Sequence, residues 1–145
     1  MTELNQTPRY KKVMIIDDTQ VDRFIAERNI KKYCFAEEVI SKESARTALD
    51  YLLLFCENPN DLPQLIFLDI RMPEIDGFGF LEEYEKLPVQ VRKNCIIMML
   101  TSSLNPDDME KAKGNKYVNR FLNKPLDKER FNEIENISVR SDFQS

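Results

Sequence analysis

The sequence contains no histidine among its 145 residues. This absence excludes catalysis by an imidazole acid or base, metal binding through imidazole, and a phosphohistidine carried by the chain itself. Cysteine is rare, and Cys34, Cys56 and Cys95 lie far apart without CxxC spacing. Cysteines so placed indicate neither a disulfide framework nor a zinc site, and they suit a reducing cytoplasm.

Glycine and long apolar runs are also scarce. With 3 glycines and 7 prolines, the composition argues against flexible linkers and low-complexity segments. No apolar run approaches the roughly 18 residues of a membrane span, and residues 1–7 lack the features of a signal peptide. The net charge of -4 does not favour binding to nucleic-acid phosphates. We therefore expect a cytoplasmic protein that binds neither nucleic acid nor membrane.

What is present is the composition of one globular domain, with 42% hydrophobic and 32% charged residues. Short apolar runs indicate strands buried in a parallel sheet, and apolar residues at three- and four-residue steps indicate helices between them. This alternation predicts a doubly wound α/β fold with helices on both faces of the sheet. The expected strands cover residues 13–16, 37–41 (at a sheet edge), 65–69, 95–100 and 117–122, and the expected helices 19–33, 45–56, 78–87, 106–113 and a last segment after Asp127.

Local signals set the expected helix ends and faces. The polar pair Asp18-Thr19 is the candidate cap of the first helix, and Asn105 followed by Pro106 is typical of a helix start. Gly114 is placed to end that later helix. The first helix is expected to be amphipathic through the apolar residues Val21, Phe24, Ile25, Ala26, Ile30 and Tyr33.

Polar side chains follow four of the expected strands, namely Asp17 and Asp18, then Asp69, Thr101 and Lys124. Because the carboxyl ends of parallel strands lie on one edge of a sheet, we expect these side chains to converge. Three carboxylates in one crevice repel one another, at a cost on the order of 4 kcal/mol for each pair about 4 Å apart. A divalent cation removes that cost, and an all-oxygen site with room for water favours Mg²⁺.

The same set of residues suits phosphoryl transfer. Mg²⁺, the ammonium of Lys124 and the hydroxyl of Thr101 together neutralise the oxygens of a transferred phosphoryl group. The nucleophile should be a carboxylate, because no serine, cysteine or histidine is better placed, and we choose Asp69. Asp17 and Asp18 are adjacent and suit metal binding. Taken singly, each residue has a plainer interpretation as a helix cap or a solvated charge, so their joint occurrence carries the argument.

Together these residues resemble the receiver domains of two-component response regulators. The resemblance implies a flavodoxin-like, five-stranded parallel sheet of order 2-1-3-4-5. It also implies a receiver domain over residues 11–137, a polar lead-in over 1–10 and a polar tail over 138–145. The match runs from Lys11 to Ile137 and rests on the motifs Asp17-Asp18, Asp69-Ile-Arg-Met-Pro-Glu-Ile-Asp-Gly77, Thr101-Ser102 and Lys124-Pro125.

The resemblance implies a role for each acidic residue. Asp69 would accept a phosphoryl group from a histidine kinase or a phosphotransfer protein. Asp17, Asp18 and Asp69, with the backbone carbonyl of Arg71, would hold Mg²⁺. Arg71 and Ser103 would set how fast the acyl phosphate hydrolyses. The chain would not be an enzyme, because it would only phosphorylate and dephosphorylate its own aspartate in a Mg-dependent reaction.

The remaining implied roles concern the phosphate and its consequences. Thr101 and Lys124 would contact the phosphate, and the Lys124–Pro125 peptide bond would be cis. After phosphorylation, Thr101 would move toward the phosphate and Phe121 would rotate inward, which changes the face built from the fourth helix, fifth strand and fifth helix. A core aromatic without a switching role is an equally good interpretation of Phe121.

Three other functions fit parts of the pattern. A phosphatase of the haloacid dehalogenase type also phosphorylates an aspartate after a strand, but it needs a second aspartate two residues later, where this chain has Arg71. A flavin or nucleotide site needs a Gly- or Ser/Thr-rich loop after the first strand, where this chain has Asp17-Asp18. A degenerate receiver that serves as a phosphorylation-independent docking module stays open.

We expect a single-domain response regulator, because little sequence follows Ile137. Such a regulator would signal by altered contacts with a downstream protein target, or it would pass the phosphoryl group to a histidine on another protein. It would be a monomer, or a weak dimer on phosphorylation. The expected partner surface lies around residues 105–109, Tyr117 and the last helix.

Overall fold

The computed structural model describes residues 7–138, which form a five-stranded parallel sheet of order β2-β1-β3-β4-β5. The predicted fold class and strand order are therefore confirmed. Most of the predicted lead-in, and the predicted tail apart from its first residue, lie outside the described residues. The strands are β1 (Tyr10–Ile16), β2 (Ala36–Lys42), β3 (Leu65–Asp69), β4 (Ile96–Thr101) and β5 (Val118–Asn123).

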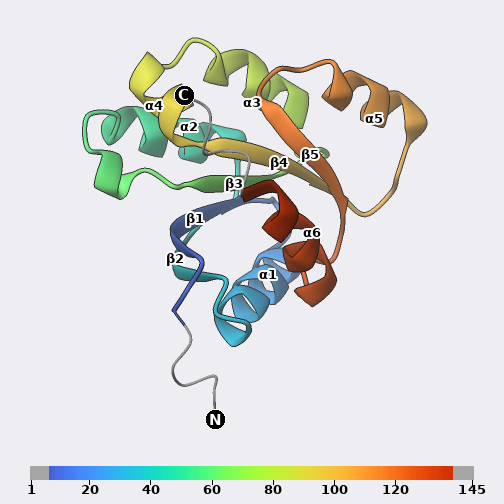
Figure 1. The fold of residues 1–145 in the computed structure, drawn as a ribbon. Helices are drawn as coiled ribbons and strands as arrows, with labels where there is room; N and C mark the ends of the chain where they lie inside the picture. Colours follow the sequence, from blue (N-terminus) through green and yellow to red (C-terminus); the bar gives the residue numbers. More distant parts are fainter. Residues whose placement is uncertain (1–6, 139–145) are drawn as a thin grey trace.

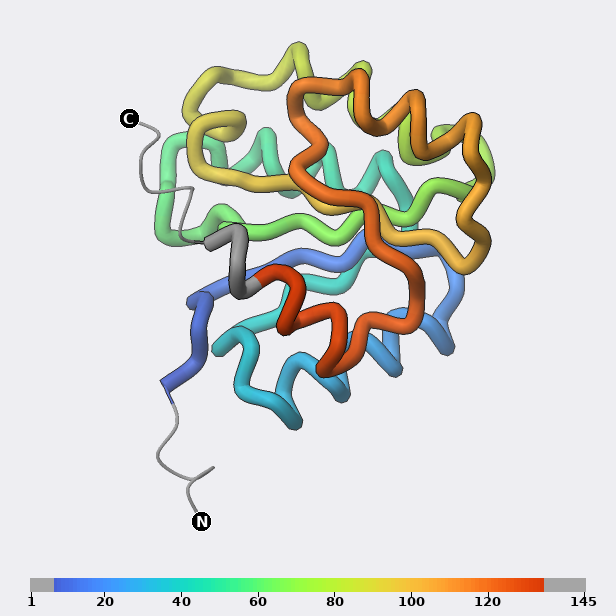
Figure 2. The backbone as a smooth tube through the Cα atoms, turned by 45° about the vertical axis from the view of Figure 1, so that its right-hand side comes forward, coloured from blue at the N-terminus to red at the C-terminus, as the bar shows by residue number. Residues whose placement is uncertain are grey.

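Helices cover both faces of the sheet (Figure 1). In that view α1 and α6 lie below the sheet, and α2, α3, α4 and α5 lie above it. Figure 2 shows the red chain of α6 beside the blue chain of α1 on the same side of the sheet. The helices are α1 (Gln20–Lys32), α2 (Ala45–Leu54), α3 (Gly77–Tyr84), α4 (Val89–Asn94), α5 (Pro106–Lys113) and α6 (Lys128–Ser138), with a 3₁₀ turn over Pro59–Asp61.

Two apolar clusters, one on each face of the sheet, form the core. Alternate residues of the central strands, such as Met14 and Ile66, belong to the cluster with α2, α3 and α5, while their neighbours Val13 and Phe67 belong to the cluster with α1 and α6. Every residue from Val13 to Ile16 and from Leu65 to Leu68 is buried. Burial on both faces explains why these strands read as unbroken apolar runs.

The predicted strands all occur, with ends within three residues of those observed. The prediction missed the short helix α4, which follows Pro88. The third helix was expected to reach residue 87, but it ends at Tyr84. Pro88 restricts the backbone before it, and the preceding residues close in tight turns, with the Leu87 amide donating to the Tyr84 carbonyl over 3.0 Å.

The predicted buried face of α1 is wrong in part. Ala26 and Ile30 are buried as expected, whereas the side chains of Val21 and Phe24 are 62% and 63% exposed. At 3.6 residues per turn, residues 22, 26 and 30 share one stripe, and residues 21 and 24 lie on the opposite side. Both sets satisfy three- and four-residue spacing, and the sheet covers only one of them.

The parallel register brings the carboxyl ends of four strands to one edge of the sheet. Ile16 pairs with Leu68, and Asp69 with Leu100, so β1, β3 and β4 end at the same level. The loops that follow these strand ends carry the polar residues predicted to converge.

No helix in the described part of the chain is long and apolar enough to cross a membrane.

Candidate functional site

Three carboxylates meet at the carboxyl ends of β1 and β3. One carboxylate oxygen from each of Asp17, Asp18 and Asp69 lies within 4.8 Å of the others. Asp17 and Asp69 are only 2% and 6% exposed, whereas Asp18 faces solvent. The three acidic residues predicted from the sequence are thus adjacent in space, with one of them open to incoming ligands.

The position of Asp69 depends on a close approach between β3 and α3. The Gly77 amide donates to the Ile70 carbonyl over 2.8 Å, just after the strand ends. A Cβ atom at residue 77 would lie 2.7 Å from the Asp69 carbonyl oxygen, so only glycine fits here. The start of α3 therefore fixes the backbone that carries Asp69.

Burial and charge repulsion act on Asp69. Burial, and then the neighbouring Asp17 carboxylate, raise the pKa of Asp69 from 3.8 to about 6, although the Lys124 ammonium counteracts this rise. At pH 7 most of the Asp69 carboxyl groups are still ionised, which a nucleophile requires. A cation between the carboxylates would favour the ionised form further.

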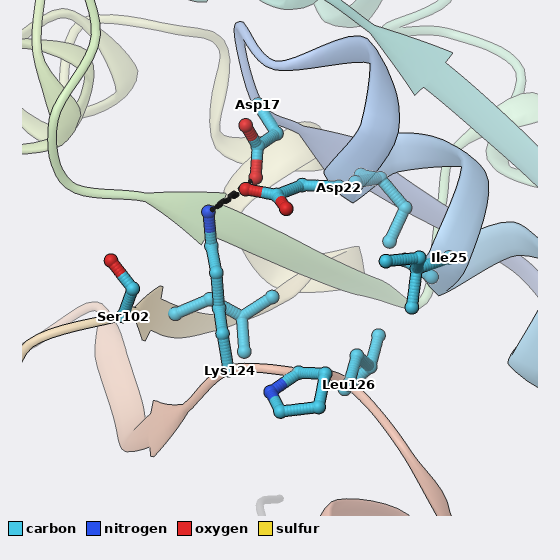
Figure 3. A pocket seen from close by; sticks show the side chains of 10 residues that line it. Asp17, Asp22, Ile25, Ser102, Lys124 and Leu126 are labelled. Carbon is cyan, nitrogen blue, oxygen red and sulfur yellow. Dashed lines mark hydrogen bonds and ion pairs between the residues drawn. The ribbon is translucent and has the colours of Figure 1, made fainter.

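Lys124 reaches this cluster from the end of β5, as Figure 3 shows. Its ammonium donates to Asp17 over 2.7 Å and to Asp22 over 2.8 Å, and it lies 3.4 Å from an oxygen of Asp69. Burial alone lowers the pKa of Lys124, but the bonds to Asp17 and Asp22 outweigh burial and raise it above the ordinary value. The Lys124 side chain therefore stays protonated and positively charged beside Asp69, the predicted phosphoryl acceptor.

Asp22 is the member of this arrangement that the sequence prediction missed. It lies in the first turn of α1, on the same stripe as the buried Ala26 and Ile30. Its position one helical turn after Asp17-Asp18 was the available signal, but an acidic residue at a helix start is usually read as a solvated charge. The partner, Lys124, lies 102 residues away in sequence.

Hydrogen bonds hold the loop after β1 in place. The Asp17 carboxylate accepts from the Thr19 amide over 2.9 Å, and the Arg23 guanidinium donates to the Asp17 carbonyl over 2.8 Å. Thr19 is the N-cap residue of α1 but its side chain makes no capping bond. The predicted cap position is therefore confirmed at Thr19, although the Asp17 carboxylate, and not the Thr19 side chain, accepts a hydrogen bond in this turn. Asn105 does cap α5 as predicted, and Gly114 follows its end.

Thr101 ends β4 beside the cluster and is 5% exposed. Its hydroxyl donates to the Ser103 carbonyl over 2.9 Å and accepts from the Ser103 amide over 3.2 Å. The Lys124 amide donates to the Thr101 carbonyl over 2.8 Å, which ties the two strand ends together. The Lys124–Pro125 peptide bond is cis, as predicted. The Thr101 hydroxyl is thus engaged with its own loop in this state.

Arg71 sends its side chain away from the carboxylates. The guanidinium is 66% exposed and pairs with Asp108 in the first turn of α5. This ion pair links the loop after β3 to the start of α5. Of Arg71, only the backbone carbonyl was predicted to bind the metal, and the direction of the side chain leaves that prediction open.

Phe121 lies in β5, away from the carboxylates, and is half-buried. It packs against the cluster that includes α2, α3 and Ala112 of α5. The residues beside it form a groove of about 500 Å³ between α5 and β5. The structure therefore places Phe121 both in contact with the core and at a surface. This groove is lined by Pro106, Met109, Glu110, Ala112, Lys113, Val118, Asn119, Arg120 and Phe121.

The donor set fits a hard divalent cation. The adjacent donors are carboxylate oxygens, and the nearest nitrogen, on Lys124, is a protonated ammonium that cannot bind a metal. Oxygen-only sites of one to three carboxylates are typical of Mg²⁺ and Mn²⁺. The acidic cluster is thus suited to a divalent metal.

Comparisons with known proteins agree with this geometry. The family model described as the response regulator receiver domain matches residues 13–135. A crystal structure of a response regulator receiver protein from Dyadobacter fermentans is 30% identical, with a TM-score of 0.77 over 87% of this chain and 96% of that chain. Response regulator Rcp1 from Synechocystis is 29% identical over 79% of this chain and 76% of its own length.

Two solved structures bear on the metal. Rcp1 is known in a Mn²⁺-bound form, which is 25% identical, with a TM-score of 0.67 over 89% of this chain and 92% of that chain. The receiver domain of the histidine kinase CKI1 from Arabidopsis thaliana is known in complex with Mg²⁺ and BeF₃⁻. It is 26% identical, with a TM-score of 0.74 over 89% of this chain and 90% of that chain.

Some matching proteins are much longer than this chain. It is 33% identical to histidine kinase 2 from Arabidopsis thaliana over 85 residues, which is 7% of that protein. Receivers thus occur both in response regulators and in histidine kinases of two-component signalling. With the family model spanning most of its length, the chain belongs to the family of response regulator receiver domains.

Proposed function

We propose that this receiver accepts a phosphoryl group on Asp69 from a phosphohistidine of a histidine kinase or phosphotransfer protein. An ionised oxygen of Asp69 attacks phosphorus, the new O–P bond forms, and the P–N bond of the donor breaks with its electron pair staying on the imidazole nitrogen. Asp17, Asp18 and Asp69, with the Arg71 carbonyl, would hold Mg²⁺. When bound, Mg²⁺ would offset the negative charge of the carboxylates and the phosphoryl oxygens.

The observation that carries this proposal is the placement of Lys124. Its ammonium lies 3.4 Å from Asp69 and is held by two further carboxylates. A fixed cation beside a buried nucleophilic carboxylate stabilises the charge that a phosphoryl group brings. The raised pKa of Asp69, about 6, still leaves it ionised at neutral pH.

The chain itself argues against the competing functions. At the position where a haloacid dehalogenase phosphatase needs its acid, Arg71 points outward and pairs with Asp108. The loop after β1 offers the carboxylates of Asp17 and Asp18 rather than a phosphate-binding loop. We therefore propose that the protein is no enzyme toward other molecules and turns over only its own aspartyl phosphate.

The proposed output is a change in protein contacts. A dianion on Asp69 is a strong acceptor, and the Thr101 hydroxyl must leave Ser103 to donate to it. This movement would shift the start of α5 and the groove beside Phe121, where a target would bind. On the other side of the site, the exposed Val21 and Phe24 of α1 offer apolar area to a phosphodonor protein.

Intact mass spectrometry tests the proposal directly. The chain is incubated with acetyl phosphate and Mg²⁺, beside an Asp69→Asn variant and a sample with EDTA. We expect an adduct of one phosphoryl group that needs Mg²⁺, is lost in alkali, and is absent from the variant. An adduct that persists in the variant would refute the choice of Asp69.

A negative result also decides between functions. If acetyl phosphate gives no adduct, beryllofluoride is added as a phosphoryl mimic, and its binding is followed by ¹⁹F NMR. Binding in the wild-type chain but not in the Asp69→Asn variant would show a competent site with slow chemistry. Without such binding, a phosphorylation-independent docking module becomes the better account of this receiver.

A further inference from the structure

We propose that Asp22 is a positioning residue that fixes the ammonium of Lys124 for phosphoryl transfer. This inference rests on the function proposed above and assigns a role to a residue outside the predicted acceptor and metal set. The starting observation is the hydrogen bond of 2.8 Å from the Lys124 ammonium to the Asp22 carboxylate, seen in Figure 3.

The three carboxylate partners of Lys124 differ in whether they also belong to the candidate metal site. An ammonium has three N–H donors, and those of Lys124 face Asp17 at 2.7 Å, Asp22 at 2.8 Å and Asp69 at 3.4 Å. Asp17 and Asp69 also belong to the cluster whose oxygens reach one cation, and Asp22 does not. Asp22 is therefore the partner of Lys124 whose negative charge would not be shared with a bound cation.

Asp22 is also placed on a rigid element. It lies on the same stripe of α1 as Ala26 and Ile30, which are 4% and 0% exposed and pack against the sheet. The side chain of Asp22 is itself only 36% exposed. A carboxylate on a packed helix limits where the ammonium can lie, which a solvated partner would not do.

The way in which the N–H groups of Lys124 are shared among its partners gives Asp22 its proposed role. With one N–H bound to Asp22, Lys124 can turn the remaining N–H groups toward Asp69 and the phosphoryl oxygens. Without Asp22, the ammonium is free to move toward Asp17 and away from the reacting atoms. A plainer role for Asp22 is the stabilisation of the positive start of α1, which would affect folding but not Lys124.

The test compares four forms of the full chain. Asp22→Asn removes the charge, and Asp22→Glu restores it on a longer side chain. Glu27→Gln removes the same charge from the same helix, and Glu27 is not among the ion-pair partners of Lys124. Each form is assayed for the rate of phosphorylation by acetyl phosphate with Mg²⁺, and for unfolding by urea.

A second readout needs no phosphoryl donor. The ¹⁵N NMR signal of the Lys124 ammonium reports how firmly its protons are held, because hydrogen-bonded ammonium protons exchange slowly with water. We expect this signal in the wild-type and Glu27→Gln chains. It should broaden or vanish in Asp22→Asn and return in Asp22→Glu.

The expected kinetic result is a loss of about tenfold in the phosphorylation rate of Asp22→Asn, as for removal of one charge-assisted hydrogen bond. Asp22→Glu should recover most of that loss, and Glu27→Gln should match the wild type. An unchanged phosphorylation rate in Asp22→Asn would overturn the inference whatever the Lys124 signal shows, as would a change in unfolding alone.

The two proposals fail in different ways. If the wild-type chain takes up no phosphoryl group and binds no beryllofluoride, the proposed function fails and the inference fails with it. If the wild-type chain is phosphorylated and Asp22→Asn is equally fast, only the inference fails. In that case the contact between Asp22 and Lys124 is structural.

Discussion

Replacing Asp69 with asparagine should stabilise the folded chain at neutral pH, although it removes the proposed acceptor. Burial and the Asp17 carboxylate raise the pKa of Asp69 from 3.8 to about 6. An acid that ionises less readily when folded lowers the free energy of unfolding at pH 7, here by up to about 3 kcal/mol. Lys124 keeps its bonds to Asp17 and Asp22, so the variant does not leave it unpaired. Because the pKa of Asp69 also depends on the charges of Asp17 and Lys124, we expect Asp69→Asn to raise the free energy of unfolding at pH 7 by about 1 to 3 kcal/mol.

The sign follows from proton binding. Because the folded pKa of Asp69 lies above 3.8, the folded chain binds more protons than the unfolded chain between pH 3.8 and about 6. Stability therefore falls as the pH rises through this window, and the penalty is complete above it. The advantage of Asp69→Asn should be largest at about pH 7.5, about half as large at pH 5, and close to zero at pH 3.

Urea unfolding followed by circular dichroism, in EDTA, measures this effect. Asp50→Asn serves as the control, because it removes an exposed charge from α2 and should change the free energy of unfolding by less than about 0.5 kcal/mol. Adding Mg²⁺ should reduce the difference in free energy of unfolding between Asp69→Asn and the wild type. A ligand at about 100 times its Kd stabilises the protein that binds it by about 2.7 kcal/mol, and here that protein is the wild type. A variant no more stable than the wild type at pH 7.5 without metal would refute the electrostatic reasoning.

Three further predictions use the same preparations. Gly77→Ala should lower the free energy of unfolding by about 1 to 3 kcal/mol and slow phosphorylation, because the new methyl group would displace the Asp69 carbonyl 2.7 Å away. Asp76→Ala should lower it by about 1 kcal/mol through loss of the cap of α3, which Asp76→Asn should largely keep. Burial raises the pKa of Cys95 to about 12, so at pH 8 mass spectrometry should show its thiol resisting alkylation until urea is added, while the other two cysteines react.

The sheet could be predicted because its strands need no tertiary information to be identified. Residues 13–16 and 65–68 are apolar at every position, and so short an unbroken run is typical of a strand covered on both faces. The site followed from the same argument, since any polar residue at such a strand end lies on one edge of the sheet. The convergence of Asp17, Asp69 and Lys124 could therefore be predicted without knowing the conformation of the loops.

Helix faces and short helices were harder to predict. In α1, both the stripe of residues 22, 26 and 30 and the set of 21, 24 and 25 have helical spacing, and only contact with the sheet selects the first. The six residues of α4 are too few to show a period. Spacing alone thus identified where α1 lies but not which side of it faces the sheet.

Asp22 shows why the sequence located the acceptor but not its full environment. Its contact with Lys124 spans 102 residues and depends on the rotation of α1 about its axis, which the spacing of apolar residues did not determine. With the stripe of 22, 26 and 30 facing inward, Asp22 must lie beside the end of β1, where the half-buried ammonium of Lys124 needs carboxylate partners. The burial of Ala26 and Ile30 and the placement of Asp22 beside Lys124 are therefore one structural fact, because both follow from the same rotation of α1. Sequence spacing grouped Ala26 and Ile30 with Val21 and Phe24 as the apolar residues of α1, so it did not determine the rotation that brings Asp22 to Lys124.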